Sequence, residues 1–506
     1  MGLYDFTFYD LVKRNAVCFE KGDAWLEVGD DRTLTFSEYK QQVDRLATGF
    51  LKAGIRKGDR VGVLGKNVAE YFMIYGAAAA TGAIVLPINW RLSADEVGYN
   101  LNDCEPKWVF VDPDFQETVK GIQGSLSSVE KFFNLGLAGG EFADFGELMA
   151  EGDGFEEQEV HTDDGFVIIH TAAVAGRPRG ALLSHGNVLW ANMHFMYQIG
   201  LGPGDALLNI LPLFHVGGLF AATATFHAGG LTANVKKFDA SQAAKLVEDR
   251  GLTFMVEFPP ILASILDEHE KNGADISSLR AVGGLDSPET IERYQRLTGG
   301  HFYCLYGQTE TSCLATFSRY DDKPGSAGRM LPMAQVQMVD DYDRPVETGQ
   351  VGEITVRGPM VFKGYWNLQE DTAHTFREGW HHTGDLGRFD EDGFLWYAGR
   401  KAEKELIKPG GENVYPAEVE KVIIQHPAVE MTVVFGVPDP KWGEGIKAVC
   451  KLEQGQTMTA QELIDFVGER IARYKKPQYV EFVEDFPVTE NGDPDRNKIK
   501  EIYGGS

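Results

Sequence analysis

The segment HTAAVAGRPRG, residues 170–180, contains residue types that can bind phosphate. It follows a short apolar run at 166–170 and precedes a helix expected to open near Ser184. A glycine-containing turn at the end of a strand exposes successive backbone N–H groups, which bind phosphate oxygens. Arg177 and Arg179 would add charge-assisted donors. The G-x-x-x-x-G-K-[ST] pattern is absent, and an ordinary turn between a strand and a helix is the alternative interpretation.

The segment YGQTE, residues 306–310, ends another apolar run. Polar side chains at the carboxyl end of a parallel strand lie where such sheets bind ligands. Thr309 could donate to a phosphate, and Glu310 could hold Mg²⁺. A surface loop without a ligand is the alternative.

Two later segments offer further polar groups. In WHHTGDLG, residues 380–387, Asp385 could accept hydrogen bonds from both hydroxyls of a ribose, whereas the adjacent His381 and His382 are more typical of a core or a surface than of a metal site. The segment 399–420 begins with Gly399-Arg400 and continues through charged residues to a Gly-Gly turn. This pattern suggests a mobile joint that contacts a nucleotide, with a solvated linker as the alternative.

Alternating strand and helix patterns must position these residues. From about residue 165, short apolar runs alternate with helical segments, which predicts a largely parallel sheet with helices on both faces. A similar rhythm over residues 40–111 predicts a second such sheet. After about residue 326, short alternating runs with turn signals predict antiparallel strands in a small β-barrel-like part.

The fold class is therefore α/β, with a large N-terminal domain and a small, mobile α+β C-terminal domain. We place the boundaries at 1–399 for the first domain, 400–405 for a hinge and 406–506 for the C-terminal lid. Within this lid we expect a helix at 416–426, strands at 432–437 and 446–452, and a helix after Thr459, where Glu462 completes a capping box.

Composition excludes several classes of protein. The 506 residues carry 48 Lys and Arg against 75 Asp and Glu, a formal charge of −27, so nucleic acid is an unfavourable partner. Five scattered cysteines and the lack of a secretory signal favour the cytoplasm. The most apolar stretch, residues 71–88, is interrupted by Gly and Pro and predicts a buried helix followed by a strand rather than a membrane span.

In this order and spacing, the segments resemble the adenylate-forming superfamily of acyl-CoA synthetases, synthetase adenylation domains and luciferases. The resemblance covers essentially the whole chain and includes LPLFHVGG (211–218), the GGL turn (283–285) and ARYKKP (472–477). It is strongest for an AMP-forming carboxylate–CoA ligase. Such an enzyme joins a carboxylate to AMP with Mg-ATP, rotates its C-terminal domain, and passes the acyl group to CoA.

The resemblance also implies roles for individual residues. Thr309 would contact the α-phosphate and Glu310 would organise Mg²⁺. His215 would flank the acyl group where the thiol enters, and Lys404 aligns with the hinge. The expected binding residues for ATP and CoA are Thr171, Gly176, Arg177 and Arg179 at the phosphate loop, Gly284 and Leu285 beside the adenine, Tyr306, Gly307 and Gln308, Asp385 and Arg400 at the ribose, and Gly410 and Gly411 near the CoA pantetheine.

Two departures from the family pattern affect the phosphate groups. Ala172, Ala173, Val174 and Ala175 replace most of the usual hydroxyl and glycine residues, Arg179 replaces a lysine, and Thr171 is the hydroxyl that is left. If each lost hydrogen bond contributes roughly 1.5–3 kcal/mol, binding of ATP or pyrophosphate weakens. The second departure is Asp493, which follows Gly492 where the family has its adenylating lysine; Arg496 and Lys498 are candidate replacements.

The sequence supports an acid–CoA ligase for an aromatic, alicyclic or medium-chain acid, with the reverse reaction towards ATP also open. The preference for such acids rests on Phe220, Phe258 and Tyr303, which are apolar and equally compatible with the core. A non-catalytic acyl-adenylate or acyl-CoA binding protein is the alternative, but the intact Glu310, Asp385 and Arg400 favour the enzyme. The oligomeric state is open, with a homodimer as one alternative.

Overall fold

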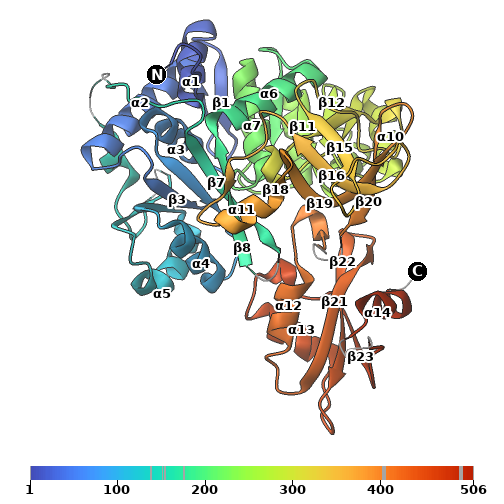
Figure 1. Ribbon diagram of the computed structural model, residues 1–506. Coiled ribbons are helices and arrows are strands. Elements are labelled where there is room, and N and C mark those ends of the chain that lie inside the picture. The colour runs from blue at the N-terminus through green and yellow to red at the C-terminus, as the bar shows by residue number, and fades with distance from the viewer. Residues whose placement is uncertain are drawn as a thin grey trace.

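The computed structural model describes residues 2–136, 139–150, 152, 155–174, 177–401, 406–488 and 494–504, with side chains for all of these except residues 172–174, 177 and 497. Two lobes are visible (Figure 1): a large part built on three sheets, and a smaller C-terminal unit that begins beyond residue 405. The α/β class and the two-lobed architecture expected from the sequence are confirmed.

The first sheet of the large part has eight strands in the order β14-β13-β12-β11-β9-β10-β1-β2. Its inner pairs are parallel, and the pairs β1–β2 and β13–β14 are antiparallel. Helices cover both faces, because α6 and α7 share one apolar cluster with the sheet and α8 to α10 share another. The strands are β1 (Asp23–Glu27), β2 (Arg32–Thr35), β9 (Ala206–Asn209), β10 (Leu231–Asn234), β11 (Phe254–Glu257), β12 (Ala281–Gly284), β13 (His301–Tyr306) and β14 (Thr316–Arg319). The helices are α6 (His185–Ile199), α7 (Val216–Ala228), α8 (Ala240–Arg250), α9 (Ile261–Asn272) and α10 (Pro288–Thr298).

The second sheet has seven strands in the order β17-β8-β7-β4-β3-β5-β6. The predicted buried helix and strand at 71–88 are α3 (Ala69–Thr81), whose every residue is buried, and β4 (Ile84–Ile88). The largest apolar cluster joins α3 and α7 to strands of both sheets, so the main core lies between the sheets. The other elements are β3 (Arg60–Leu64), β5 (Trp108–Val111), β6 (Lys131–Asn134), β7 (Gly165–Val174), β8 (Arg177–Ser184), β17 (Gly364–Tyr365), α1 (Phe8–Cys18), α2 (Phe36–Lys52), α4 (Ala94–Cys104) and α5 (Gln116–Ile122).

Residues 170–180 are predicted to form a loop between a strand and a helix, but the structure shows strands here. Strands β7 and β8 form an antiparallel hairpin, with Thr171 opposite Arg179, and α6 begins only after Ser184, its N-cap residue. The chain continues as strand to Val174 because it pairs with β8, a partner that the local sequence pattern does not reveal.

The third sheet is antiparallel, as expected for the stretch after residue 326. It contains β15 (Gln335–Val339), β16 (Gly352–Arg357), β18 (Phe376–Arg377), β19 (Trp380–Phe389) and β20 (Leu395–Arg400), with α11 (Gln369–Thr375) beside it. Its strand β20 ends at Arg400, the first residue of the expected hinge. Residues 402–405 of that hinge lie outside the described residues, so the 400–405 boundary stays a prediction.

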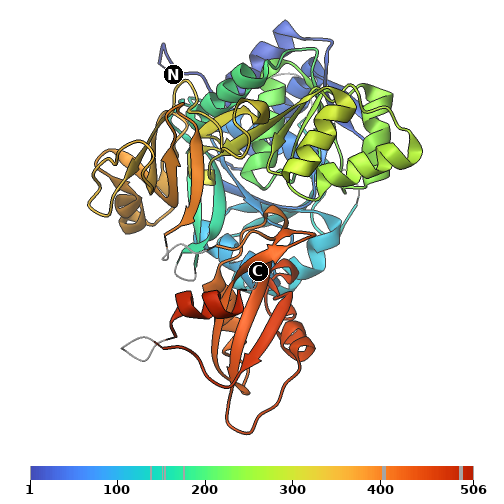
Figure 2. The ribbon, with the colours of Figure 1, turned by 90° about the vertical axis from the view of Figure 1, so that its right-hand side faces the viewer.

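The C-terminal unit contains a three-stranded sheet with α12, α13 and α14 around it (Figure 2). Its strands are β21 (Val429–Asp439), β22 (Gly443–Leu452) and β23 (Tyr479–Val483), and its helices are α12 (Pro416–Ile423), α13 (Ala460–Gly468) and α14 (Arg496–Tyr503). The capping box of Thr459 and Glu462 is present at the start of α13, as predicted. Both predicted strands are longer than expected because they pair as one hairpin.

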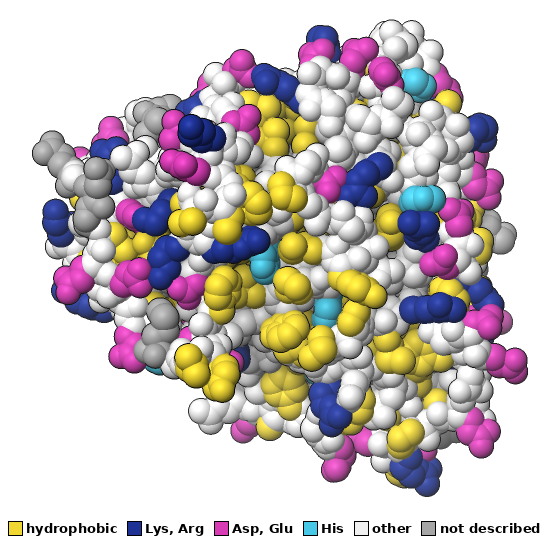
Figure 3. All heavy atoms as spheres, turned by 90° about the horizontal axis from the view of Figure 1, so that it is seen from above, with side chains coloured by type: hydrophobic (Ala, Val, Ile, Leu, Met, Phe, Trp, Pro, Cys, Tyr) yellow, Lys and Arg dark blue, Asp and Glu magenta, His cyan; other side chains and the backbone are white. Residues whose placement is uncertain are grey.

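The surface agrees with the strongly acidic composition. Seen from above, Asp and Glu side chains are frequent along the margin, while hydrophobic side chains gather nearer the middle (Figure 3). In the described part of the chain, the helices are all too short or too polar to cross a membrane.

A close backbone contact shapes the loop that carries His215. A Cβ atom added to Gly218, in the first turn of α7, would lie 2.2 Å from the carbonyl oxygen of Pro212. We therefore expect Gly218→Ala to lower the free energy of unfolding by about 1–3 kcal/mol, because the backbone must shift. Gly98→Ala in α4 is the matched control, because its Cβ would make only an ordinary contact at 3.7 Å. The higher helix propensity of alanine should raise the free energy of unfolding of this variant by about 0.5–1 kcal/mol.

Urea denaturation of both variants measures these changes. Equal effects of the two substitutions would contradict the role assigned to the Pro212 contact.

Candidate active site

A buried carboxylate, Asp385 on β19, joins three of the predicted nucleotide-binding residues. Its Oδ2 accepts hydrogen bonds from the hydroxyl of Tyr306 at 2.8 Å and the Nε2 of Gln308 at 2.6 Å. Its Oδ1 accepts from the Nε of Arg400 at 2.8 Å. Asp385 is 3% exposed, so these donors and the guanidinium charge offset the cost of burying its charge. The structure thus brings Tyr306, Gln308, Asp385 and Arg400 into one cluster.

His381 supports this cluster through Gln308. It is 1% exposed, its Nδ1 pairs with the hydroxyl of Thr375 at 3.0 Å, and its Nε2 lies 3.4 Å from the Oε1 of Gln308. His382 is also buried and lies 3.3 Å from Glu353. Both histidines are buried in β19, and the core is one of the environments expected for them.

Glu310 follows Gln308 in the sequence and lies on a short 3-10 turn (Thr309–Thr311). Its Oε1 accepts a hydrogen bond from the hydroxyl of Tyr365 at 2.8 Å. Burial, together with the charge of Glu310, raises the pKa of Tyr365 well above its ordinary value, so this hydroxyl remains a donor. Gly307 is required here because a Cβ would meet the carbonyl oxygen of Cys313 at 1.8 Å.

Arg179, which replaces the expected lysine, is buried and engaged. It donates to Asp371 at 3.0 Å and to the hydroxyl of Tyr365 at 3.1 Å, and its guanidinium lies 4.0 Å from the Tyr365 ring centroid. Its Nε is buried and has no hydrogen-bond partner among the described residues. Arg179 therefore supports the tyrosine that holds Glu310, and it leaves one donor to satisfy near the hairpin tip.

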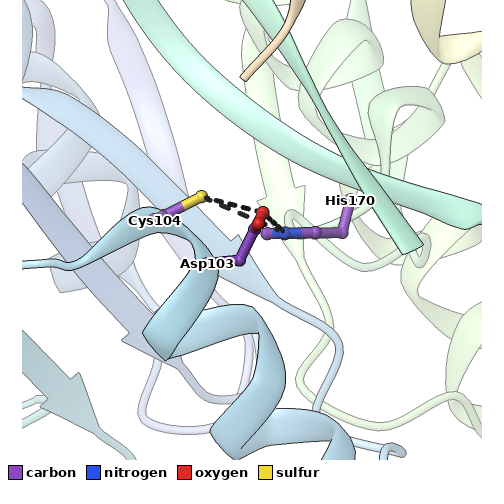
Figure 4. A group of neighbouring side chains, drawn as sticks. All are labelled: Asp103, Cys104 and His170. Atoms are coloured by element: carbon purple, nitrogen blue, oxygen red, sulfur yellow. Dashed lines mark hydrogen bonds and ion pairs between the residues drawn. The ribbon is translucent and has the colours of Figure 1, made fainter. Parts of the chain in front are cut away.

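His170 fixes the middle of the β7–β8 hairpin, where it pairs with Gly180. Its Nε2 lies 2.9 Å from Asp103 Oδ2 and 4.0 Å from the Sγ of Cys104, both at the end of α4 (Figure 4). The ring also contacts Tyr99 edge-on, and the Tyr99 hydroxyl donates to the carbonyl of Pro178. These contacts tie α4 to both strands of the hairpin that carries Thr171 and Arg179.

His215 lies at the N-terminus of α7 and lines a cavity of about 510 Å³. Its Nδ1 accepts from the backbone N–H of Gly217 at 3.1 Å. Burial, with the nearby charges of Lys408 and Arg91, lowers the pKa of His215 to about 4, so the ring is neutral at physiological pH. The cations lining the cavity are Lys66, Arg91, Lys236 and Lys237, and its apolar wall includes Phe258 and Ile261.

Gly410 and Gly411, from the C-terminal unit, line the same cavity. Both have positive φ, 57° and 84°, which favours glycine. A Cβ on Gly411 would lie 3.0 Å from the ring of Phe258, so the backbone of this turn packs against the large part. The structure thus joins His215 to the Gly-Gly turn across almost two hundred residues of sequence.

Two other predicted groups have different surroundings. Gly284 ends β12 beside β11, where a Cβ would meet the carbonyl oxygen of Glu257 at 2.1 Å, and Leu285 is 42% exposed. Among the apolar candidates, Phe258 lines the cavity, whereas Phe220 and Tyr303 are buried in the main core.

Several predicted residues lie outside the described part of the chain: Lys404, Gly176, Ala175, Gly492 and Asp493. The side chains of Ala172, Ala173, Val174 and Arg177 are likewise outside it. Of the candidate replacements for the adenylating lysine, Arg496 pairs with Glu420 at 2.6 Å and Lys498 with Asp495 at 3.3 Å, both within the C-terminal unit.

Sequence reasoning missed Lys408 and Tyr365. Lys408 is an exposed residue, but partial desolvation of its ammonium and the charge of Arg400 lower its pKa to about 8, while Asp385 acts in the opposite direction. Lys408 therefore lies close to both the Asp385 cluster and His215. The position of Lys408 directly before the Pro-Gly-Gly turn could have indicated a site residue. Tyr365 is 55 residues from Glu310 in sequence, and no local pattern indicates their contact.

This arrangement suits two reactions at adjacent places. Arg179 brings positive charge near Glu310, and Arg400 and Lys408 bring it near Asp385; such charge can stabilise a phosphate under attack. The cavity beside neutral His215 is bordered by the Gly-Gly turn and lined by four cations and Glu412, which favours an extended anionic ligand.

Comparisons with known proteins agree with this arrangement. A model of the AMP-binding enzyme family matches residues 12–366, and one of the AMP-binding enzyme C-terminal domain matches residues 418–493. The chain is 34% identical over 479 residues to an indoleacetate–CoA ligase of Aromatoleum aromaticum, covering 93% of this chain and 94% of the relative. It is 34% identical over 478 residues to a feruloyl-CoA synthase of Amycolatopsis, with the same coverage.

A solved structure supports the same assignment. The o-succinylbenzoate CoA synthetase of Bacillus subtilis, bound to a product analogue, is similar with a TM-score of 0.86 and 28% identity, covering 98% of each chain. Since the family model covers most of the chain and its relatives are similar over almost all of it, the chain belongs to the AMP-binding enzyme family, as an adenylate-forming enzyme of the acid–CoA ligase type.

Proposed function

We propose that this acid–CoA ligase activates an aromatic carboxylic acid, with alicyclic and medium-chain acids as the alternatives to be tested. An oxygen of the acid attacks the α-phosphorus of ATP, and pyrophosphate leaves. The thiol of CoA then attacks the acyl carbonyl, and AMP leaves. The observation that carries the proposal is the cavity in which His215 of the large part meets Gly410 and Gly411 of the C-terminal unit.

The adenylation step uses residues of the large part. Asp385 and Arg400 bind the ribose, and Tyr306 and Gln308 hold Asp385 in place. Thr309 donates to the α-phosphate. The residues fit a magnesium ion, because Glu310 supplies a hard carboxylate oxygen and Mg²⁺ completes its shell with phosphate and water oxygens. When bound, this ion offsets the charge that builds up on the phosphates.

The altered hairpin weakens the first step without abolishing it. Thr171 is positioned opposite Arg179, and its hydroxyl lies 3.4 Å from the Arg179 carbonyl oxygen. Arg179 retains positive charge near Glu310, which compensates in part for the missing hydroxyl groups. We therefore propose a functional site with a raised KM for ATP, in place of a non-catalytic binding protein.

The transfer step uses the cavity between the two units. Pantetheine passes Gly410 and Gly411, and the phosphates of CoA lie near Lys236 and Lys237 at the rim. Lys408 stabilises the oxyanion that forms on the acyl carbonyl and the charge of the departing AMP. Neutral His215 borders the acyl group.

The aromatic preference rests on two kinds of support. Relatives with similar coverage are named for indoleacetate, ferulate and 2-succinylbenzoate. Phe258 on the cavity wall offers its ring to the acyl group, edge-on to His215 with centroids 6.5 Å apart. We also propose a cytoplasmic location, in keeping with five free cysteines.

The proposed activity is tested by AMP release that depends on ATP, Mg²⁺ and CoA, across benzoates, arylacetates, cinnamates, alicyclic acids and C2–C12 acids. Acyl-CoA formed together with AMP, most efficiently from an aromatic acid, is the expected result. No acid-dependent AMP in this panel, and no ATP from acyl-CoA, AMP and pyrophosphate, would overturn the ligase proposal.

Glu310→Gln should lower the rate of acyl-adenylate formation by about 100-fold, because it removes a charged ligand for Mg²⁺ while keeping the shape of the side chain. The hydrogen bond from Tyr365 can remain, so the thermal midpoint should not fall. Acid-dependent exchange of pyrophosphate into ATP measures the step at several Mg²⁺ concentrations. If a folded Glu310→Gln variant exchanged pyrophosphate into ATP at the wild-type rate, Glu310 would not be the magnesium ligand.

The transfer step should depend on the charge of Lys408. Below pH 8 this ammonium is protonated, and it loses its proton as the pH rises through its pKa of about 8. The rate of Lys408→Met, divided by that of the wild type at the same pH, should therefore be lowest near pH 6.5 and rise above pH 8. Taking the ratio cancels the ionisation of the CoA thiol.

Single-turnover transfer from preformed acyl-adenylate measures the ratio, and Lys408→Arg is the control because its charge persists above pH 8. A ratio that does not change with pH would contradict the role of this ammonium.

A further inference from the structure

A buried ammonium links the C-terminal unit to the large part. Lys475 lies 2.5 Å from the Oε1 of Glu96 on α4 and 2.6 Å from the Oε2 of Glu418 on α12. The Lys475 side chain is 5% exposed, so both ion pairs are largely shielded from water. Glu96 belongs to the large part and Glu418 to the C-terminal unit, so only the first of these two pairs crosses between them.

Glu96 accepts hydrogen bonds from both units. Its Oε2 accepts from the backbone N–H and hydroxyl of Ser93, at 2.8 Å each, as part of the capping box of α4. The same oxygen accepts from the backbone N–H of Ala472 at 3.2 Å. Burial raises the pKa of Glu96, but the charge of Lys475 and these hydrogen bonds outweigh it and lower the pKa. The carboxylate therefore remains charged and binds both the backbone N–H of Ala472 and the ammonium of Lys475.

A second contact lies beside the first. Arg91 forms an ion pair with Glu412, and the Nδ2 of Asn89 lies 3.4 Å from the same carboxylate. Glu412 directly follows Gly411, and both Arg91 and Glu412 line the cavity. The α4 side of the large part faces the C-terminal unit in both ribbon views (Figures 1 and 2). Residues 89–96 thus hold the C-terminal unit where its Gly-Gly turn reaches His215.

We propose that Glu96 and Lys475 are positioning residues for the transfer of the acyl group to CoA and not for its adenylation. They fix the orientation in which Lys408, Gly410 and Gly411 border the reacting groups. The residues assigned to adenylation, such as Glu310 and Asp385, lie in the large part and keep their contacts without this pair. The inference rests on the proposed function, because it assigns a contact to one of its two steps.

Two isosteric substitutions test the proposal. Glu96→Gln and Glu418→Gln each remove one negative charge from the same ammonium, but only the first weakens the contact between the units. Lys475 keeps one carboxylate partner in either variant, so neither leaves it as an uncompensated buried charge. Lys475→Arg keeps the charge and should retain most of the transfer rate.

The two steps are measured separately with the full chain. For Glu96→Gln, we expect pyrophosphate exchange to be unchanged within error and single-turnover transfer from acyl-adenylate to fall by about 100-fold, the cost of a small misplacement of reacting groups. Glu418→Gln should leave both rates unchanged within error. Thermal midpoints of both variants show whether a loss reflects unfolding.

Hydrogen exchange provides a readout that does not need activity. The amide of Ala472 should exchange faster in Glu96→Gln than in the wild type or Glu418→Gln, because its acceptor loses charge. Equal losses in both steps, equal effects of the two substitutions, or unchanged transfer and amide exchange in Glu96→Gln would each overturn the proposal. A wild type that lacks both steps would overturn the proposed function, while amide exchange would still test the contact.

Discussion

The ion pair between Asp385 and Arg400 is the interaction on which the site depends. A carboxylate that is 3% exposed is unfavourable unless donors and a positive charge surround it, and Tyr306, Gln308 and Arg400 meet this need. These three residues come from the end of β13, the following turn and the end of β20. One buried charge therefore fixes the strand ends of two sheets and the first residue of the expected hinge.

Close backbone contacts impose a second constraint. Gly218, Gly284 and Gly307 each lie so near a carbonyl oxygen that a Cβ would overlap it, and Gly411 packs against the Phe258 ring. A side chain at any of the first three positions would push the two backbone segments apart. The glycines of the motifs are thus explained by distance in the folded chain, and positive φ adds a reason at Gly410 and Gly411.

The β7–β8 hairpin carries the charge of Arg179 where the family pattern has a lysine. In place of a flexible lysine, Arg179 binds Asp371 and Tyr365, and Tyr365 donates to Glu310. A planar guanidinium offers five N–H donors in a fixed fork and a flat face that stacks on an aromatic ring, an arrangement that a lysine ammonium does not reproduce. Arg179 therefore links the hairpin to Glu310, the proposed metal ligand. His170, in the middle of the hairpin, links it to α4 through Asp103.

The sequence by itself determined the alternation of strands and helices, the antiparallel stretch after residue 326 and the motif residues around Asp385, because each leaves a local pattern of apolar spacing or turn residues. It predicted a loop at residues 171–180 where the chain forms a hairpin, since strand pairing depends on a partner that local pattern does not reveal. Only the tertiary structure decided that Tyr365 meets Glu310, that Arg179 is buried beside them, and that Glu96 receives Lys475 across 379 residues. Such contacts depend on how separate elements pack, and a side chain's partner is set by that packing rather than by its neighbours in sequence.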